Sequence, residues 1–157
     1  MDRKSKREVE FRWEKCGIRR EKEGESEMIK ELIVESRNRE QLIEVSGLVQ
    51  KVLQEMEMRE GLCVIHVPHT TAGITINENA DPDVVRDILS GLDRIVPSGG
   101  YRHGEGNSPA HIKASLMGHA VTVIVENNVM RLGTWQGIYL CEFDGPRRRK
   151  LWVSLRG

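Results

Sequence analysis

The sequence has few aromatic residues, no net charge and no long apolar run. Phe, Trp and Tyr make up 4% of the 157 residues, and 24 Lys and Arg balance 24 Asp and Glu. A neutral chain lacks the basic field with which proteins bind nucleic acid or anionic membranes. No apolar stretch approaches the about 20 residues of a membrane-spanning helix. We therefore expect neither nucleic acid nor a membrane as a partner.

Cysteine is also scarce, with three residues and no C-x-x-C pair. Zinc ribbons and thioredoxin-type centres are therefore not indicated. Cys63 and Cys141 lie in the apolar runs LCVIHV and IYLCEF, where a thiol usually fills core space. The first residues contain no apolar segment of a secretory signal. We expect a reduced, cytoplasmic protein.

Residues 1–26 differ in composition from the rest. They contain nine Lys or Arg and seven Asp or Glu, and Phe11, Trp13 and Ile18 are their large apolar residues. This segment cannot build a core, so we predict a flexible arm of residues 1–26, followed by a single domain over residues 27–157. A nucleic-acid-binding arm is the less favoured alternative, because the interspersed acids nearly cancel its charge.

The hydrophobic pattern of the domain mixes strands and helices without strict alternation. Strands are predicted in MIKELIVES, QLIEV, LCVIHV, GITIN, HAVTVIVEN, LGTWQGIYLCEF and KLWVSL. Helices are predicted from Ser46 as N-cap, from Asp81-Pro82, and from Ser108-Pro109 to just before Gly118. The prediction is an α+β fold with a mixed or antiparallel, sandwich-like sheet core flanked by helices.

Four of the five histidines fall between positions 66 and 111. His69 follows Pro68 at a strand end, and the hydroxyls of Thr70 and Thr71 stand beside it. A loop histidine is often a plain surface residue, yet this one is a site candidate. His66 shares a strand face with Val64, which favours a structural role.

Several polar residues after this loop have no evident structural role. Asp81 already caps a helix, which leaves Asn77 and Glu78 as candidate site residues. In HGEGN, glycines alternate with His103, Glu105 and Asn107, so that the backbone can approach a ligand closely. A flexible surface loop is the alternative interpretation.

His111 lies in the first turn of the helix that begins at Ser108-Pro109. Free N–H groups and the positive dipole end favour an anion such as phosphate there. The same dipole favours a neutral imidazole, available as ligand or base. His69, His103 and His111 could also hold zinc or iron. No two of them share a helix at i, i+4 spacing, so spacing alone does not indicate a metal.

Two stretches near the C-terminus each have a structural and a functional interpretation. In GTWQG, Trp135 is most simply a core or interface aromatic, whereas the amide of Gln136 could orient a ligand. The basic run at residues 147–150 follows an Asp-Gly-Pro turn. It indicates a solvated hairpin end more than a phosphate-binding patch.

The stretches HTTAGITINENADP, HGEGNSPAHIKASLMG and LGTWQGIYLCEFDGPRRR resemble the YjbQ-like family of secondary thiamine-phosphate synthases, and the resemblance extends over roughly residues 28–156. It implies a compact α+β domain, a homotrimer, and sites in clefts near subunit boundaries. The segment before Met28 has no counterpart in the family pattern. The positions that match the family's polar motifs are His69, Thr70, Asn77, Glu78, His103, Glu105, Asn107, His111, Thr134, Trp135 and Gln136.

The activity implied by this resemblance is transfer of a hydroxymethylpyrimidine group from its diphosphate to a thiazole phosphate. Glu78 and Glu105 could hold magnesium in such a site, and Lys113 or Arg102 could contact phosphate. We expect His69, Glu78, His103, Glu105 and His111 to act in catalysis. Ligand binding is assigned to Thr70, Thr71, Asn77, Asn107, Lys113, Thr134 and Gln136. The alternative is a non-catalytic trimer that binds a metal or a small anion.

Overall fold

The computed structural model describes residues 28–157, which form two antiparallel sheets and three helices. Predictions about residues 1–26 lie outside this range. The strands are β1 (Met28–Glu35), β2 (Gln41–Glu44), β3 (Glu60–His66), β4 (Ala72–Glu78), β5 (Ala120–Glu126), β6 (Val129–Met130), β7 (Gln136–Glu142) and β8 (Arg148–Arg156). The helices are α1 (Ser46–Glu55), α2 (Pro82–Ile95) and α3 (Ser108–Met117).

The larger sheet has the strand order β1-β8-β3-β5-β6. Its strands alternate between buried and exposed residues, as in β8, where Leu151, Val153 and Leu155 are buried and Trp152 is 42% exposed. This period of two puts one face of the sheet in the core. The alternation that predicted strands in MIKELIVES and KLWVSL is thus confirmed.

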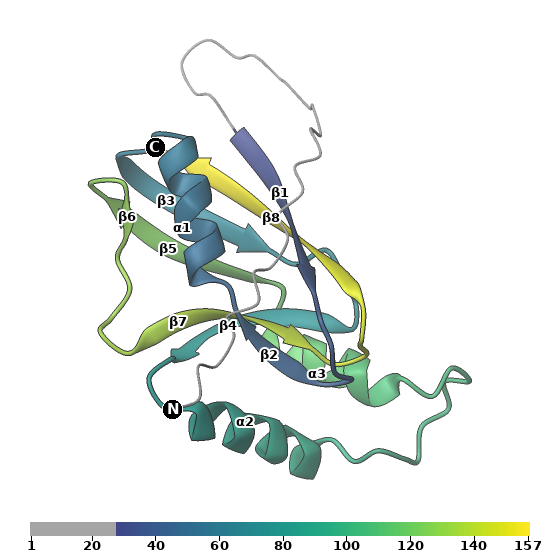
Figure 1. The fold of residues 1–157 in the computed structure, drawn as a ribbon. Coiled ribbons are helices and arrows are strands. Elements are labelled where there is room, and N and C mark those ends of the chain that lie inside the picture. Colours follow the sequence, from purple (N-terminus) through teal and green to yellow (C-terminus); the bar gives the residue numbers. More distant parts are fainter. Residues whose placement is uncertain (1–27) are drawn as a thin grey trace, which may run out of the picture.

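The smaller sheet, in the order β2-β7-β4, is buried on both faces. Ile138 and Leu140 of β7 face the larger sheet and α1, while Tyr139 and Cys141 pack with α2 and α3. Figure 1 shows α1 beside the larger sheet and α2 and α3 beyond the smaller one. The predicted α+β sandwich in a single domain is confirmed, with antiparallel pairing in both sheets.

The three predicted helix starts have different outcomes. The helix predicted from Ser108-Pro109 to just before Gly118 is confirmed as α3, although its N-cap is Asn107. Asp81 caps α2 as predicted, since its Oδ1 accepts a hydrogen bond of 2.9 Å from the Asp83 N–H. The prediction for Ser46 is wrong, because the N-cap of α1 is Val45. The Ser46 hydroxyl instead accepts from the Ile138 N–H at 2.8 Å, which ties the helix to β7. A tertiary partner has here replaced the local cap.

The side of the larger sheet that faces away from the core carries exposed apolar side chains. Ile29, Leu62, Ile124 and Trp152 are 55%, 45%, 61% and 42% exposed, and we call this the outer sheet face. Cys63 and Cys141 are completely buried, and burial raises the pKa of each thiol to about 12. Their predicted role as core residues is confirmed. Between residues 28 and 157, no helix combines the length and apolar character of a membrane span.

Candidate functional site

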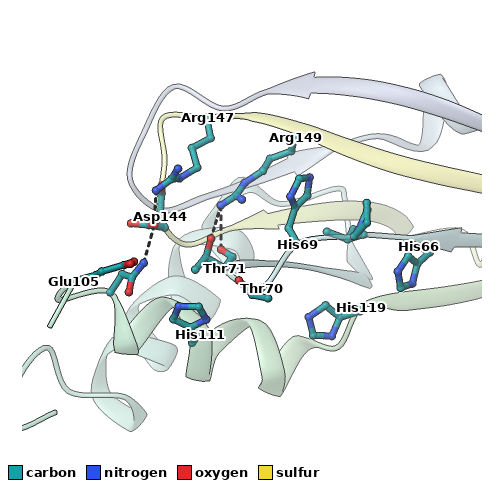
Figure 2. A pocket seen from close by; sticks show the side chains of 13 residues that line it. His66, His69, Thr70, Thr71, Glu105, His111, His119, Asp144, Arg147 and Arg149 are labelled. Atoms are coloured by element: carbon teal, nitrogen blue, oxygen red, sulfur yellow. Dashed lines mark hydrogen bonds and ion pairs between the residues drawn. The ribbon is translucent and has the colours of Figure 1, made fainter. Parts of the chain in front are cut away.

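A cavity of about 580 Å³ opens between the loop after β3, the start of α3 and the start of β8. Figure 2 shows its polar side chains arriving from these segments, which are far apart in the sequence. We call it the histidine pocket. It is lined by His66, Val67, Pro68, His69, Thr70, Thr71, Glu105, Asn107, His111, His119, Asp144, Arg147 and Arg149.

The loop after β3 supplies the first wall. Pro68 cannot donate to a ladder and ends the strand, while the Val67 N–H donates to the His119 carbonyl at 2.8 Å. The ring of His69 is fixed, because its Nε2 accepts a hydrogen bond of 2.8 Å from the Lys150 backbone N–H. Burial and the nearby positive charge of Arg149 hold the pKa of His69 below its ordinary value. A neutral imidazole is therefore favoured.

A buried ion pair forms the floor of the pocket. Arg149 is 4% exposed, and its Nη2 lies 2.5 Å from Glu142 Oε1 and 2.8 Å from Thr71 Oγ1. Its Nε donates to Glu142 Oε2, which also accepts from the Ser36 hydroxyl, at 2.8 Å in each case. Burial acts to raise the pKa of Glu142, but these hydrogen bonds outweigh it and leave the pKa lowered. The pair fixes the guanidinium rigidly.

A second charged pair stands at the pocket's edge. Arg147 donates from Nη2 to Asp144 Oδ2 at 2.7 Å and from Nε to the Asp144 carbonyl at 2.6 Å. Asn107 Nδ2 donates to the same Oδ2 at 3.3 Å. Burial acts to raise the pKa of Asp144, yet the hydrogen bonds from Asn107 and Arg147 lower it overall. This carboxylate thus links the loop before α3 to the turn between β7 and β8.

The start of α3 brings His111 to the pocket. His103 does not line this pocket, but its ring contacts that of His111. The two imidazoles are in edge-to-face contact, with ring centroids 5.6 Å apart. His103 lines a neighbouring hollow of about 430 Å³ with Tyr101, Arg102, Ser108 and Ile112, and His111 borders both cavities. The His111 N–H already donates to the Asn107 carbonyl at 3.3 Å. That donor is therefore used within the helix.

Four predicted site residues lie elsewhere in the chain. Glu78 ends β4 and pairs with Gln136 of β7, and Asn77 and the exposed Thr134 flank them. Thr71 in the pocket directly precedes β4, whose seven residues span about 20 Å at a rise of about 3.3 Å per residue. Within one chain, this second cluster is therefore remote from the histidine pocket.

Lys113 is a buried residue of α3 and does not line the histidine pocket. Its side chain is 2% exposed, and its Nζ lies 2.7 Å from Glu40 Oε1 and 2.5 Å from Asp93 Oδ1. Burial acts to lower the pKa of Lys113, but its hydrogen bonds with Asp93 and Glu40 raise it overall. The ammonium group binds these two carboxylates and thereby joins α3 to α2 and to the turn before β2. We assign it a structural role.

Known proteins share the sequence pattern and the fold of this chain. The family profile of UPF0047 protein YjbQ-like matches residues 30–157. The chain belongs to this family. UPF0047 protein YugU of Bacillus subtilis is 48% identical over 132 residues, covering 83% of this chain and 100% of YugU. A UPF0047 protein of Archaeoglobus fulgidus is 40% identical over 127 residues, covering 79% and 98% of the two chains.

Solved structures of the family share the fold. An uncharacterised conserved protein of the YjbQ/UPF0047 family from Clostridium acetobutylicum superposes with a TM-score of 0.78 at 56% identity, covering 80% of this chain and 98% of its own. A YbjQ-like protein of unknown function from Sulfolobus solfataricus gives a TM-score of 0.81 at 28% identity, covering 85% and 99%. The architecture of residues 28–157 is therefore that of the UPF0047 family.

In this family member, the donor set within one chain does not fit the expected three-histidine metal site. His69 uses Nε2 as an acceptor for Lys150, and His103 faces a different hollow from His69. Over residues 28–157, no three His, Cys, Asp or Glu side chains are grouped so that they could hold a metal ion. No catalytic role of these side chains is therefore assigned through a metal held within one chain.

Glu142 and Asp144 were not predicted as site residues, and the interpretation of the basic run at residues 147–150 is only partly correct. The interpretation of residues 147–150 as a solvated hairpin end holds for the exposed Arg148 and is wrong for Arg149, which is buried. One signal was available, because Glu142 lies inside the apolar run IYLCEF, and a carboxylate buried there requires a cationic partner. The chain crosses from the smaller sheet to the larger one between β7 and β8, which brings Arg149 to Glu142.

Proposed function

We propose that the histidine pocket binds a phosphorylated small molecule and that the protein is an enzyme acting on it. The observation that carries this proposal is the pair of guanidinium groups of Arg147 and Arg149 in the pocket wall. Arg149 binds the Glu142 carboxylate through Nε and Nη2, and Arg147 binds Asp144 through the same two nitrogens. Among the described residues, neither Nη1 has a hydrogen-bond partner. Preorganised guanidinium donors suit phosphate oxygens.

The resemblance implies a thiamine-phosphate synthase-like reaction, and we propose it as the chemistry. The bond between the hydroxymethyl carbon of the pyrimidine and its diphosphate oxygen breaks, and the electron pair leaves with the diphosphate. The thiazole nitrogen supplies the pair for the new C–N bond. Negative charge grows on the leaving diphosphate, where Arg147 and Arg149 would stabilise it. His111 and Glu105, which line the same pocket, would orient the rings.

We further propose a homotrimer in which a neighbouring copy brings its second cluster to the histidine pocket. This accounts for Asn77, Glu78, Thr134 and Gln136, which match the family's motifs but lie about 20 Å from the pocket by the length of β4. Trp135 beside them is 64% exposed, and the outer sheet face is apolar. Exposed apolar surfaces of this kind are typical of subunit contacts.

Binding of inorganic phosphate tests the pocket. Arg147→Gln should weaken binding at least about tenfold, because a charge-assisted hydrogen bond contributes about 1.5–3 kcal/mol. Arg148→Gln is the matched control, since Arg148 is the next residue, is exposed and does not line the pocket. Equal affinity of the two variants, measured by calorimetry, would contradict the proposed anion site.

The shared site is tested by mixing two variants. Arg147→Gln damages the pocket and Glu78→Gln damages the second cluster, so each protein alone should lose turnover. In randomly mixed trimers, about a quarter of the boundaries would join an intact pocket to an intact second cluster. Recovered turnover of hydroxymethylpyrimidine diphosphate and thiazole phosphate supports the arrangement. No recovery after confirmed subunit exchange would contradict it.

The second candidate function is a non-catalytic trimer that binds a small anion or a divalent metal such as zinc, iron or magnesium. It is favoured by the balance of charges at the pocket, where Arg147 is paired with Asp144, Arg149 is paired with Glu142, and Glu105 adds a further carboxylate. Such a pocket has no large excess of positive charge with which to stabilise a leaving diphosphate. Phosphate binding without turnover, or stoichiometric metal in protein purified without a histidine tag, would favour this function.

A further inference from the structure

The Lys150 backbone N–H determines the chemical state of His69. Its nitrogen lies 2.8 Å from His69 Nε2, and a peptide N–H can only donate. Nε2 must therefore present its lone pair. Since a neutral imidazole carries one proton, that proton is on Nδ1.

The position of Lys150 in the sheet explains why this hydrogen bond exists. The ladder between β3 and β8 ends with the pair His66 and Trp152, and Lys150 is the residue of β8 two positions beyond it. The same register would place Pro68 opposite Lys150, after β3 has ended. The imidazole of His69 takes the place of the missing strand acceptor and satisfies the N–H.

Burial and two nearby cations both oppose a positive charge on the ring of His69. Arg149 and Lys150 of β8 oppose a positive charge on the ring, Glu142 of β7 favours one, and burial adds to the first effect. The net result is a pKa below the ordinary value of histidine. Protonation would also place a hydrogen on Nε2, directly against the Lys150 N–H.

We infer that His69 is a neutral hydrogen-bond donor to the ligand through Nδ1–H, and is neither a metal ligand nor a base through Nε2. This inference rests on the proposed function, in which the pocket holds an anion. It assigns to His69 the recognition of an acceptor oxygen without a proton, as in an ionised phosphate or carboxylate. Because Arg149 is the neighbouring cation and its charge is fixed, such a ligand would be held without protonation of His69.

Nuclear magnetic resonance of protein labelled with ¹⁵N at histidine tests the tautomer without any ligand. His69 should show a protonated Nδ1 and an unprotonated Nε2 at pH 7, and it should titrate below the ordinary range of histidine. The exposed His103, whose nitrogens have no hydrogen-bond partner among the described residues, serves as the internal control for the tautomer alone. A proton on Nε2 of His69, or displacement of the Lys150 hydrogen bond by added zinc, would overturn the inference.

Variants test the donor role with inorganic phosphate as the probe. His69→Ala removes the donor and should weaken phosphate binding about tenfold, in line with one hydrogen bond to a charged group. His69→Gln keeps an uncharged acceptor for Lys150 and an amide donor, so affinity and melting temperature should be partly restored. Unchanged phosphate affinity in His69→Ala would overturn the donor role. Wild-type protein that binds no phosphate would overturn the proposed function and the donor role together, while the resonance experiment still decides the tautomer.

Discussion

The guanidinium of Arg149 and the carboxylate of Glu142 form an ion pair with side chains 5% and 0% exposed. Such a pair gains stability from its geometry and from additional hydrogen bonds, here from Ser36 and to Thr71. It holds the crossing from β7 to β8 and the floor of the histidine pocket in one arrangement. Any change that leaves one charge alone should affect both.

Glu142→Gln should therefore destabilise the fold. Removing one partner of a buried ion pair leaves an uncompensated charge, which typically costs about 3–5 kcal/mol. The amide also cannot accept all the hydrogen bonds now made by Arg149, Ser36 and the Asp144 N–H. Urea unfolding of wild type and variant measures the loss. Glu126→Gln, at an exposed ion pair with Arg131, is the control and should change stability by less than about 1 kcal/mol.

Stability should fall in acid because of Glu142 and Asp144. In both, hydrogen bonds and nearby arginines outweigh burial and lower the pKa in the folded protein. The unfolded chain, with ordinary carboxyl pKa values of about 4, binds more protons in this range, so stability rises with pH there. The contribution is complete above about pH 5 and is lost as the pH falls through the folded pKa values. Urea midpoints that stay constant from pH 6 to pH 3 would contradict this.

Lys113→Met should separate structural support from ligand binding. The apolar side chain has a similar length, but Glu40 and Asp93 lose their shared partner, so we expect a loss of about 1–3 kcal/mol in unfolding free energy. Phosphate affinity at 25 °C should stay close to that of the wild type, because Lys113 does not line the pocket. A large drop in affinity with unchanged stability would instead support the ligand role that the sequence had suggested.

Trp135→Ala should weaken the proposed trimer. The indole is 64% exposed within one chain, so its removal should change the folding of that chain little. A buried aromatic at a subunit contact commonly contributes 2 kcal/mol or more, that is, about 30-fold or more in association. Sedimentation at several concentrations measures the shift toward monomer. Ile95→Ala, at a 70% exposed position on α2, is the control for loss of surface area.

Local features of the chain could be predicted because they depend on neighbouring residues. The period of two in KLWVSL gave the buried face of β8, and Asp81-Pro82 gave the start of α2. Ser46 shows the limit of this reasoning, because its hydroxyl binds Ile138, 92 residues away. A hydroxyl that satisfies a distant backbone N–H cannot be distinguished from a local cap by sequence alone.

The candidate site shows the same division. The sequence by itself determined which residue types were available, and it marked His69, Glu105 and His111, which line one pocket. Only the tertiary structure decided that Arg149 is buried against Glu142, and that the Lys150 N–H holds His69 in one protonation state. The reason is physical, because burial and hydrogen-bond geometry arise where separate strands meet. The residues next to a basic run or a loop histidine in the sequence do not identify the distant group that fixes its charge.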